Sequence, residues 1–114
     1  YIEFGDINLK KIISNHDVLI STSLFEGFPN VIAQAIILNT YVISANNFGG
    51  AKDLIINRKL GIFYRLNFPK DLANKIKYVM EKKLHHITNK KSKLKLINQI
   101  KENNKKYIKF LNRI

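Results

Sequence analysis

Two compact aliphatic segments dominate the pattern of apolar and polar positions. They are Asp17 to Ser21 and Tyr41 to Ala45, and neither alternates apolar with polar residues. Such runs are typical of strands that are covered on both faces in a parallel sheet. Between them, Val31 to Leu38 has helical length and little polar face, which predicts a deeply packed helix. A third apolar run covers Ile62 to Tyr64. The alternation predicts an α/β fold with a short parallel sheet and right-handed crossovers.

The flanking segments predict further elements. Tyr1 to Phe4 has the composition of a remnant strand, and helical spacing then predicts a short helix that ends near Ser14. A second short helix is expected from Ala51 to Asn57. Pro69 has the position of a first helical residue, and this longer helix carries an apolar stripe at Leu72, Ile76, Val79, Met80 and Leu84. From Lys90 onward, a further apolar stripe among lysines predicts a basic amphipathic helix.

Composition narrows the class of protein. The chain has 114 residues, of which 46% are hydrophobic and 25% charged, so it has material for one small core and is not of disordered type. The absence of cysteine excludes disulfides and thiolate metal sites. No apolar run approaches the ~20 residues of a membrane span. The start at Tyr1, without a charged and then apolar leader, leads us to expect no signal peptide and a segment of a longer protein.

The net charge of +12 is unevenly distributed. Residues 1–81 carry 9 basic and 7 acidic groups, whereas residues 82–114 carry 11 basic and 1 acidic. Lysine, isoleucine and asparagine all have adenine- and thymine-rich codons, so base composition accounts for part of the lysine excess. Three interpretations of the basic tail stay open: packing on the domain, contact with an anionic membrane surface, and nucleic-acid binding.

Candidate chemistry gathers in the loop that follows the first strand, because ligands of open α/β sheets bind at the carboxyl ends of strands. There Gly27 permits close backbone approach and Pro29 fixes the start of the helix. The first-turn N–H groups and the helix dipole favour an anion such as a diphosphate. Glu26 offers a carboxylate to hydroxyl groups, and Gln34 lies about one turn into the helix. A simpler interpretation makes this a tight turn in which Glu26 is a local cap or a solvated charge.

The sequence from Asp17 to Leu66 resembles the donor-binding half of a retaining glycosyltransferase of family 4, which has the GT-B fold. The resemblance rests on Glu-Gly-Phe-Pro-Asn at residues 26–30 and on the Gly-Gly pair at 49–50, and it extends over about residues 1–83. It implies a partial Rossmann-like, nucleotide-sugar-binding domain at residues 1–83, followed by a basic helical tail at 84–114.

The resemblance also implies roles for individual residues. Glu26 is assigned as the catalytic residue, in contact with hydroxyls of the donor sugar. The donor-binding residues are Ser23, Gly27, Phe28, Pro29, Asn30, Val31, Gln34, Gly49 and Gly50. At position 34 the family has a glutamate that holds the ribose. A neutral amide bonds more weakly than a carboxylate, so we expect donor affinity to fall by about a factor of ten. Thr40-Tyr41 and Asp53 also depart from the family pattern.

A complete enzyme of this kind has two Rossmann-like domains, and the acceptor domain and the first half of the donor domain have no counterpart here. We therefore expect the chain alone to be inactive and to need the missing domain or a partner chain. The implied reaction transfers a sugar from a nucleotide sugar to a sugar or lipid-linked acceptor, for polysaccharide or glycolipid synthesis. No metal and no cofactor are expected, because no carboxylate pair has ligand spacing. The expected location is cytoplasmic, with the tail suited to peripheral contact at the inner membrane face.

Two other functions compete with this one. The chain is alternatively a truncated remnant without catalytic activity, or a basic module that binds membrane surfaces or nucleic acid. Loss of nucleotide-sugar binding would favour the first, and steeply salt-dependent binding to vesicles or DNA would favour the second.

Overall fold

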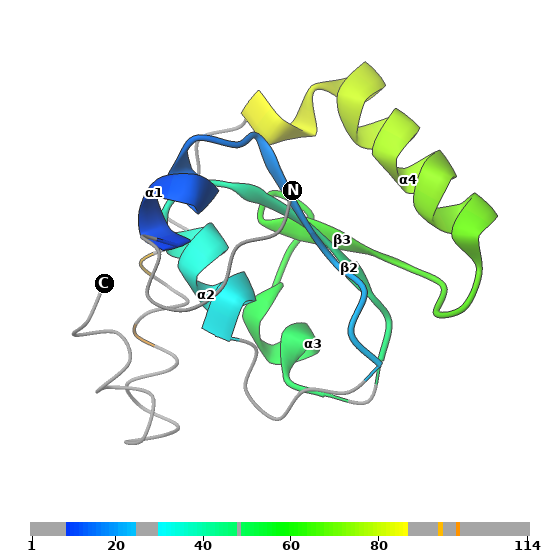
Figure 1. Cartoon of the computed structure of the whole chain (residues 1–114), viewed down its shortest axis with the longest axis horizontal. Coiled ribbons are helices and arrows are strands. Elements are labelled where there is room, and N and C mark those ends of the chain that lie inside the picture. The colour runs from blue at the N-terminus through cyan, green and yellow to red at the C-terminus, as the bar shows by residue number, and fades with distance from the viewer. Residues whose placement is uncertain (1–8, 25–29, 48, 87–93, 95–97, 99–114) are drawn as a thin grey trace.

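The computed structural model describes residues 9–24, 30–47, 49–86, 94 and 98. Within them the chain alternates helices and strands as an α/β fold, which confirms the predicted class (Figure 1). The elements are α1 (Leu9–Ser14), β1 (Val18–Ser21), α2 (Asn30–Ile37), β2 (Tyr41–Ala45), α3 (Ala51–Leu54), β3 (Gly61–Tyr64), α4 (Pro69–Lys82) and the 3-10 helix η1 (Leu84–His86). The strand predicted at residues 1–4 lies outside the described residues. So does nearly all of the predicted basic helix, of which Leu94 is helical and 61% exposed.

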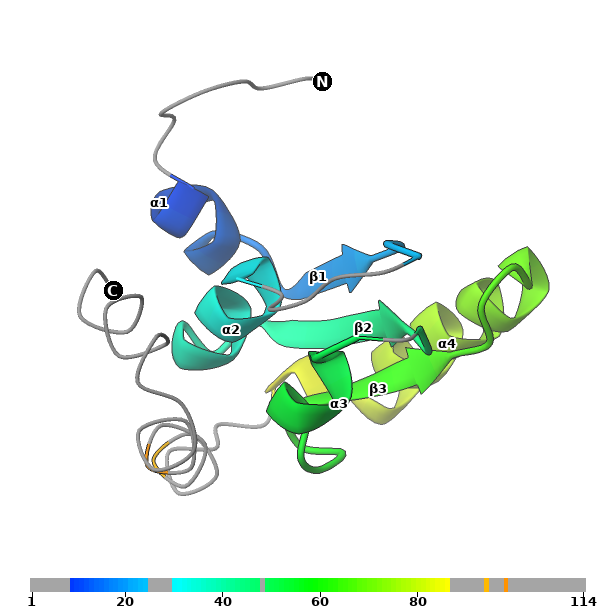
Figure 2. The same ribbon diagram turned by 90° about the horizontal axis from the view of Figure 1, so that it is seen from below.

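The three strands form one parallel sheet in the order β1-β2-β3. Val18 pairs with Tyr41 and Val42 pairs with Gly61, so each strand starts near the same edge. Helices α1, α2 and α3 cover one face, and α4 covers the other (Figure 2). All the carboxyl ends of the strands therefore meet at one edge of the sheet, where a ligand site is expected.

Central strand β2 divides the core between the two faces. Every residue of β2 is buried, with Val42 in the cluster under α2 and Ile43 in the cluster under α4. Helix α2 is as deeply packed as its sequence predicts, since Ile32 and Ile36 are almost completely buried. Removing a side chain of this kind from water contributes roughly 1.5–3 kcal/mol. The position of α2 over the sheet is therefore strongly specified.

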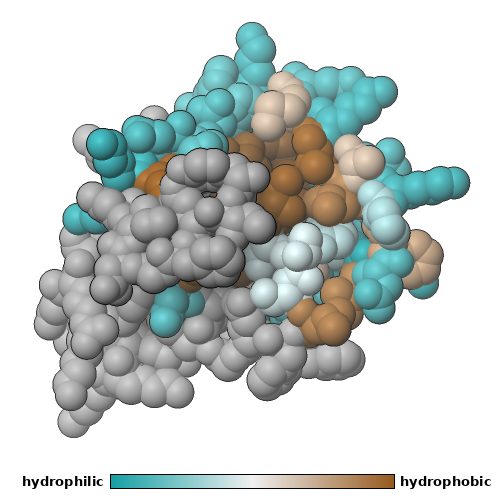
Figure 3. All heavy atoms as spheres, in the orientation of Figure 1, coloured by the Kyte–Doolittle hydropathy of each residue, from teal (hydrophilic) through white to brown (hydrophobic). Residues whose placement is uncertain are grey.

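Strand β1 differs from its prediction. Its residues are only half-buried or exposed, and Ile20 is 42% exposed, whereas an apolar run of this kind predicted cover on both faces. The reason is its place at the edge of the sheet, with one strand neighbour among the described residues. Figure 3 shows brown, apolar atoms at the surface in the middle of the face that β1 crosses in Figure 1.

Helix α4 confirms most of its predicted stripe. Val79 is fully buried, and Leu72 and Ile76 pack partly buried against the same cluster. Leu84 packs there too, but it lies in η1, beyond the end of α4. Met80 is 42% exposed and does not belong to the stripe. Adjacent residues of a helix differ by about 100° in direction, so Val79 and Met80 cannot both face the sheet.

Non-glycine residues in the left-handed region reverse the chain after two helices and before α4. Asn39 follows α2 with φ of 62°, Asn67 precedes α4 with φ of 65°, and Lys83 caps α4 with φ of 53°. Asparagine tolerates this conformation better than most side chains. The chain therefore changes direction at these three positions without glycine.

Thr40 and Tyr41 have structural roles. Both residues depart from the pattern of the family that the chain resembles. The Thr40 hydroxyl donates a hydrogen bond to the Ile13 carbonyl at 2.9 Å, which joins the end of α1 to the start of β2. The Tyr41 hydroxyl donates to the Arg58 carbonyl at 2.7 Å and so holds the loop before β3. Burial raises the pKa of Tyr41 to about 12.

Candidate functional site

The candidate site lies at the edge where the strands of the sheet end. Strands β1 and β2 end at Ser21 and Ala45, and helices α2 and α3 begin at Asn30 and Ala51 after the two loops that follow. Of the residues predicted for this site, Glu26, Gly27, Phe28 and Pro29 lie outside the described residues. Ser23, Asn30, Val31, Gln34, Gly49 and Gly50 are described, and all belong to these loops or to α2.

A hydrogen bond joins the two loops. The Asn47 side-chain amide donates to the backbone carbonyl of Ser23 at 2.6 Å, and Asn47 is only 7% exposed. The loop that follows β1 is therefore held against the loop that follows β2. Sequence reasoning did not select Asn47. A signal was present, since a side chain that can both donate and accept stands next to the Gly-Gly loop at the end of a buried strand.

Two buried amide oxygens at this end of the fold have no hydrogen-bond partner within the part of the chain that the structure describes. They are Oδ1 of Asn47 and Oε1 of Gln34. Buried polar atoms are nearly always paired in folded proteins, because an unpaired one costs about 1–3 kcal/mol. Each of these oxygens can accept a hydrogen bond from a hydroxyl or an N–H group. They are the chemical feature that most clearly sets this edge apart.

The start of α2 suits an anion. Its first turn contains no acidic side chain, so the partial positive charge of the helix end is not neutralised there. Asn30 and Val31 are both exposed at this end. Gln34 is half-buried one turn later. The three predicted residues of α2 therefore lie on the first turns of one helix, with Gln34 nearest to the core.

The start of α3 is less suited to an anion than the start of α2. Helix α3 is a single turn, and Asp53 in that turn places a carboxylate close to its N–H groups. Gly50 has φ of −76°, a conformation open to any residue, so its backbone does not require glycine. Gly49 and Gly50 are half-buried. These glycines would contribute to a site because they have no side chains to fill it, and not because their backbone conformation is unusual.

Within the described part of the chain, no three His, Asp or Glu side chains lie close enough together to hold a metal ion. Over the same residues, none of the helices has both the length and the apolar character that crossing a bilayer requires.

Comparison with known proteins gives one family. The model of the family described as glycosyl transferases group 1 matches residues 2–109. No curated protein matches the chain. The match extends over both loops of the candidate site and over the sheet that positions them.

Proposed function

Because the chain belongs to the group 1 glycosyl transferases, we propose that it carries part of the donor site of a retaining enzyme of family 4. The reaction transfers a sugar from a nucleotide-sugar donor to a polysaccharide or glycolipid acceptor. Residues 1–83 form the partial donor domain and residues 84–114 the basic tail. The observation that supports this best is the unpartnered Oε1 of Gln34, one turn into α2 at the carboxyl edge of the sheet.

The donor nucleotide binds along the start of α2 in this proposal. Backbone N–H groups from Phe28 to Val31 hold the diphosphate, and the dipole of α2 stabilises its charge. Oε1 of Gln34 accepts a hydrogen bond from a ribose hydroxyl, which gives the unpaired oxygen its partner. Gly49 and Gly50 leave room for the donor beside the second loop. Stabilisation of the leaving diphosphate by N–H groups means that no metal is needed.

The sugar of the donor lies nearer to the first loop. Glu26 accepts hydrogen bonds from its hydroxyls and is the catalytic residue. Ser23 is next to this position, and the hydrogen bond from Asn47 to the Ser23 carbonyl fixes the base of the loop. Asn47 is therefore a positioning residue. It holds Ser23, three residues before Glu26 in the sequence, against the loop that follows β2.

The acceptor side of the reaction belongs to other parts of the enzyme. A separate acceptor domain, in the same polypeptide or in a partner chain, completes the cleft, and the chain alone is inactive. The location is cytoplasmic, and the +10 excess of residues 82–114 supports peripheral contact with the anionic inner face of a membrane. A lipid-linked acceptor would be found at that face.

Calorimetric titration of the whole chain with a panel of nucleotide sugars tests the proposal. Saturable heat with at least one nucleotide sugar is expected, and it should disappear in Glu26→Ala. The matched control is Glu81→Ala, which removes an exposed carboxylate from α4 and should leave the titration unchanged. Absence of binding at millimolar donor would mean a non-catalytic remnant. Salt-sensitive binding to anionic vesicles or DNA that survives Glu26→Ala and vanishes on removal of residues 85–114 would instead mean a basic binding module.

A further inference from the structure

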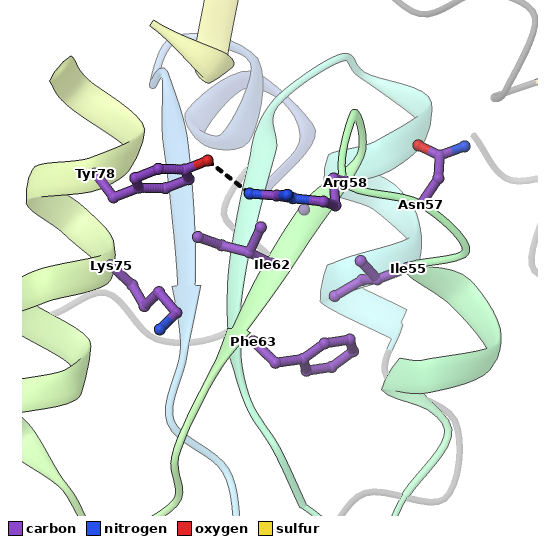
Figure 4. Close-up of a pocket in the computed structure, with 8 residues that line it drawn as sticks. Ile55, Asn57, Arg58, Ile62, Phe63, Lys75 and Tyr78 are labelled. Carbon is purple, nitrogen blue, oxygen red and sulfur yellow. Dashed lines mark hydrogen bonds between the residues drawn. The ribbon is translucent and has the colours of Figure 1, made fainter. Parts of the chain in front are cut away.

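A cavity of about 370 Å³ opens on the outer edge of β3, away from the loops of the donor site (Figure 4). Its walls come from three places: the loop between α3 and β3, strand β3 itself, and the side of α4 that faces the sheet. Strand β3 has a strand neighbour only on its β2 side among the described residues. The cavity therefore follows an unpaired edge of the sheet.

The backbone of β3 presents hydrogen-bonding groups to this cavity. The Leu60 carbonyl accepts a hydrogen bond from Val42 of β2 at 3.2 Å, and the Tyr64 carbonyl accepts one from Asn46, just after β2, at 2.9 Å. Along a parallel strand, successive residues direct their N–H and C=O groups to opposite sides. Gly61 and Phe63 therefore direct theirs away from β2, and both residues line the cavity. Such a row of donors and acceptors can pair with one more strand.

Apolar walls stand on both sides of that row. Phe63 and Ile55 pack with the cluster under α2, whereas Ile62 and Tyr78 pack with the cluster under α4. In Figure 4 these pairs lie on opposite sides of β3. An added strand would therefore place its alternate side chains against one wall and then the other.

The charge of the cavity is positive. Arg58 and Lys75 line it, and no carboxylate does. The Arg58 guanidinium donates to the Tyr78 hydroxyl at 2.6 Å, and within the described residues it has no acidic partner. Lys75 is paired with Asp71 at 3.1 Å. Arg58 is thus a fixed and uncompensated positive charge at the rim, on a chain whose net charge is +12.

We propose that the free edge of β3 binds an extended, acidic peptide segment of a partner protein by strand addition. The Gly61 and Phe63 backbone groups pair with the peptide backbone, the two walls take its alternate apolar side chains, and Arg58 pairs with a carboxylate. A second copy of this chain fits less well, because the residues that line its own β3 edge include Arg58 and Lys75 and no carboxylate with which Arg58 could pair. The proposal is independent of the donor site and of the reaction.

Fluorescence anisotropy with the whole chain tests the proposal. The probe is a blocked, dye-labelled peptide with a short run of valines between glutamates, so that valines face both walls, and its counterpart has lysine in place of glutamate. The acidic peptide should bind and the basic one should not. Arg58→Glu should weaken binding by about tenfold or more. Lys59→Glu makes the same charge change one residue along, outside the cavity, and should change affinity by no more than about twofold.

Two further peptides keep the test independent of how the variants fold. An acidic peptide N-methylated on the amides of one edge should still bind, whereas one methylated on every amide should not. Equal binding of both methylated peptides would overturn strand addition, and so would equal losses in Arg58→Glu and Lys59→Glu. Sedimentation velocity tests whether the chain forms a dimer through this edge. A dimer that dissociates in Arg58→Glu and is not displaced by the peptide would assign this edge to a second copy of the chain and refute the proposal.

Discussion

The unpaired side-chain oxygen of Gln34 predicts that stability and donor binding respond in opposite directions to substitution. In Gln34→Leu, a side chain of similar length removes the buried oxygen and leaves no polar atom behind. An unpaired buried acceptor costs about 1–3 kcal/mol. Because Gln34 is half-buried and its helix is otherwise unchanged, the lower end applies, and the free energy of unfolding should rise by about 1 kcal/mol.

Nucleotide-sugar binding should move the other way. Gln34→Leu loses the acceptor for the ribose hydroxyl, which should weaken binding by about tenfold, or ~1.4 kcal/mol. Gln34→Glu supplies a carboxylate and should strengthen binding by about tenfold, since charge-assisted hydrogen bonds are about twice as strong. It should also lower the stability of the free chain, because a buried carboxylate oxygen without a partner is costlier than an amide oxygen. Stability should therefore decrease from Leu to Gln to Glu at position 34, and affinity for the nucleotide sugar should increase in the same order.

Urea unfolding followed by circular dichroism, and calorimetric titration with the same nucleotide sugar, measure the two orders. Asn74→Leu is the matched control, since it replaces an exposed amide on α4 and should change stability by less than about 0.5 kcal/mol. If Gln34→Leu proved less stable than the wild type and bound the donor equally well, the oxygen would have a partner within the protein. The reasoning about the site would then be refuted.

Three further predictions follow from the fold, all measurable by urea unfolding. In Gly61→Ala the new Cβ would lie 2.5 Å from the Val42 backbone oxygen, so stability should fall by about 1–3 kcal/mol. The control Gly50→Ala, at φ of −76°, should change stability by less than about 0.5 kcal/mol. Equal effects of the two substitutions would contradict the close strand contact. Hydrogen bonds from the Arg65 backbone N–H and then from the Lys75 side chain hold the pKa of the Asp71 carboxyl below its usual value. The contribution of Asp71 to stability is therefore complete above about pH 4 and is lost as pH falls further. Asp71→Asn should therefore flatten the stability profile below that pH, and an unchanged profile would count against the assignment. Tyr41→Phe should cost about 1 kcal/mol at neutral pH through the lost hydrogen bond. Because the pKa of Tyr41 is raised to about 12, wild-type stability should fall as pH rises from about 10, and the variant should show less of this loss.

The sequence was sufficient to predict the central strand and the buried helix. Tyr41 to Ala45 was predicted with the bounds that β2 has, because five successive buried residues give a signal that needs no knowledge of neighbours. The predicted helix from Val31 to Leu38 differs from α2 by one residue at each end. The expectation of a glycosyltransferase is also confirmed, since the model of the group 1 glycosyl transferases matches residues 2–109. Membership of family 4 and retention of configuration stay predictions.

Features that depend on neighbouring elements could not be predicted from the sequence. The apolar run of β1 looks the same whether one or two strands lie beside it, so its exposure could not be predicted from composition. Helix α3 ends at Leu54, short of the predicted Asn57, because the chain turns there toward β3. The hydrogen bond from Asn47 to Ser23 joins residues 24 positions apart, and such a pairing depends on how the two loops are brought together by the sheet. The predicted roles of Glu26 and of residues 27–29 stay predictions.

The left-handed asparagines at 39 and 67 have an evolutionary consequence. Glycine codons require guanine, and asparagine codons do not, so a genome under pressure toward adenine and thymine tends to lose glycine. Two reversals in this chain already tolerate that loss, because an asparagine can adopt positive φ at modest cost. Gly61 cannot be exchanged in the same way, since a Cβ there would meet the neighbouring backbone. Mutational drift is thus free to act on the turns of this fold, but selection must retain glycine where two strands come closest.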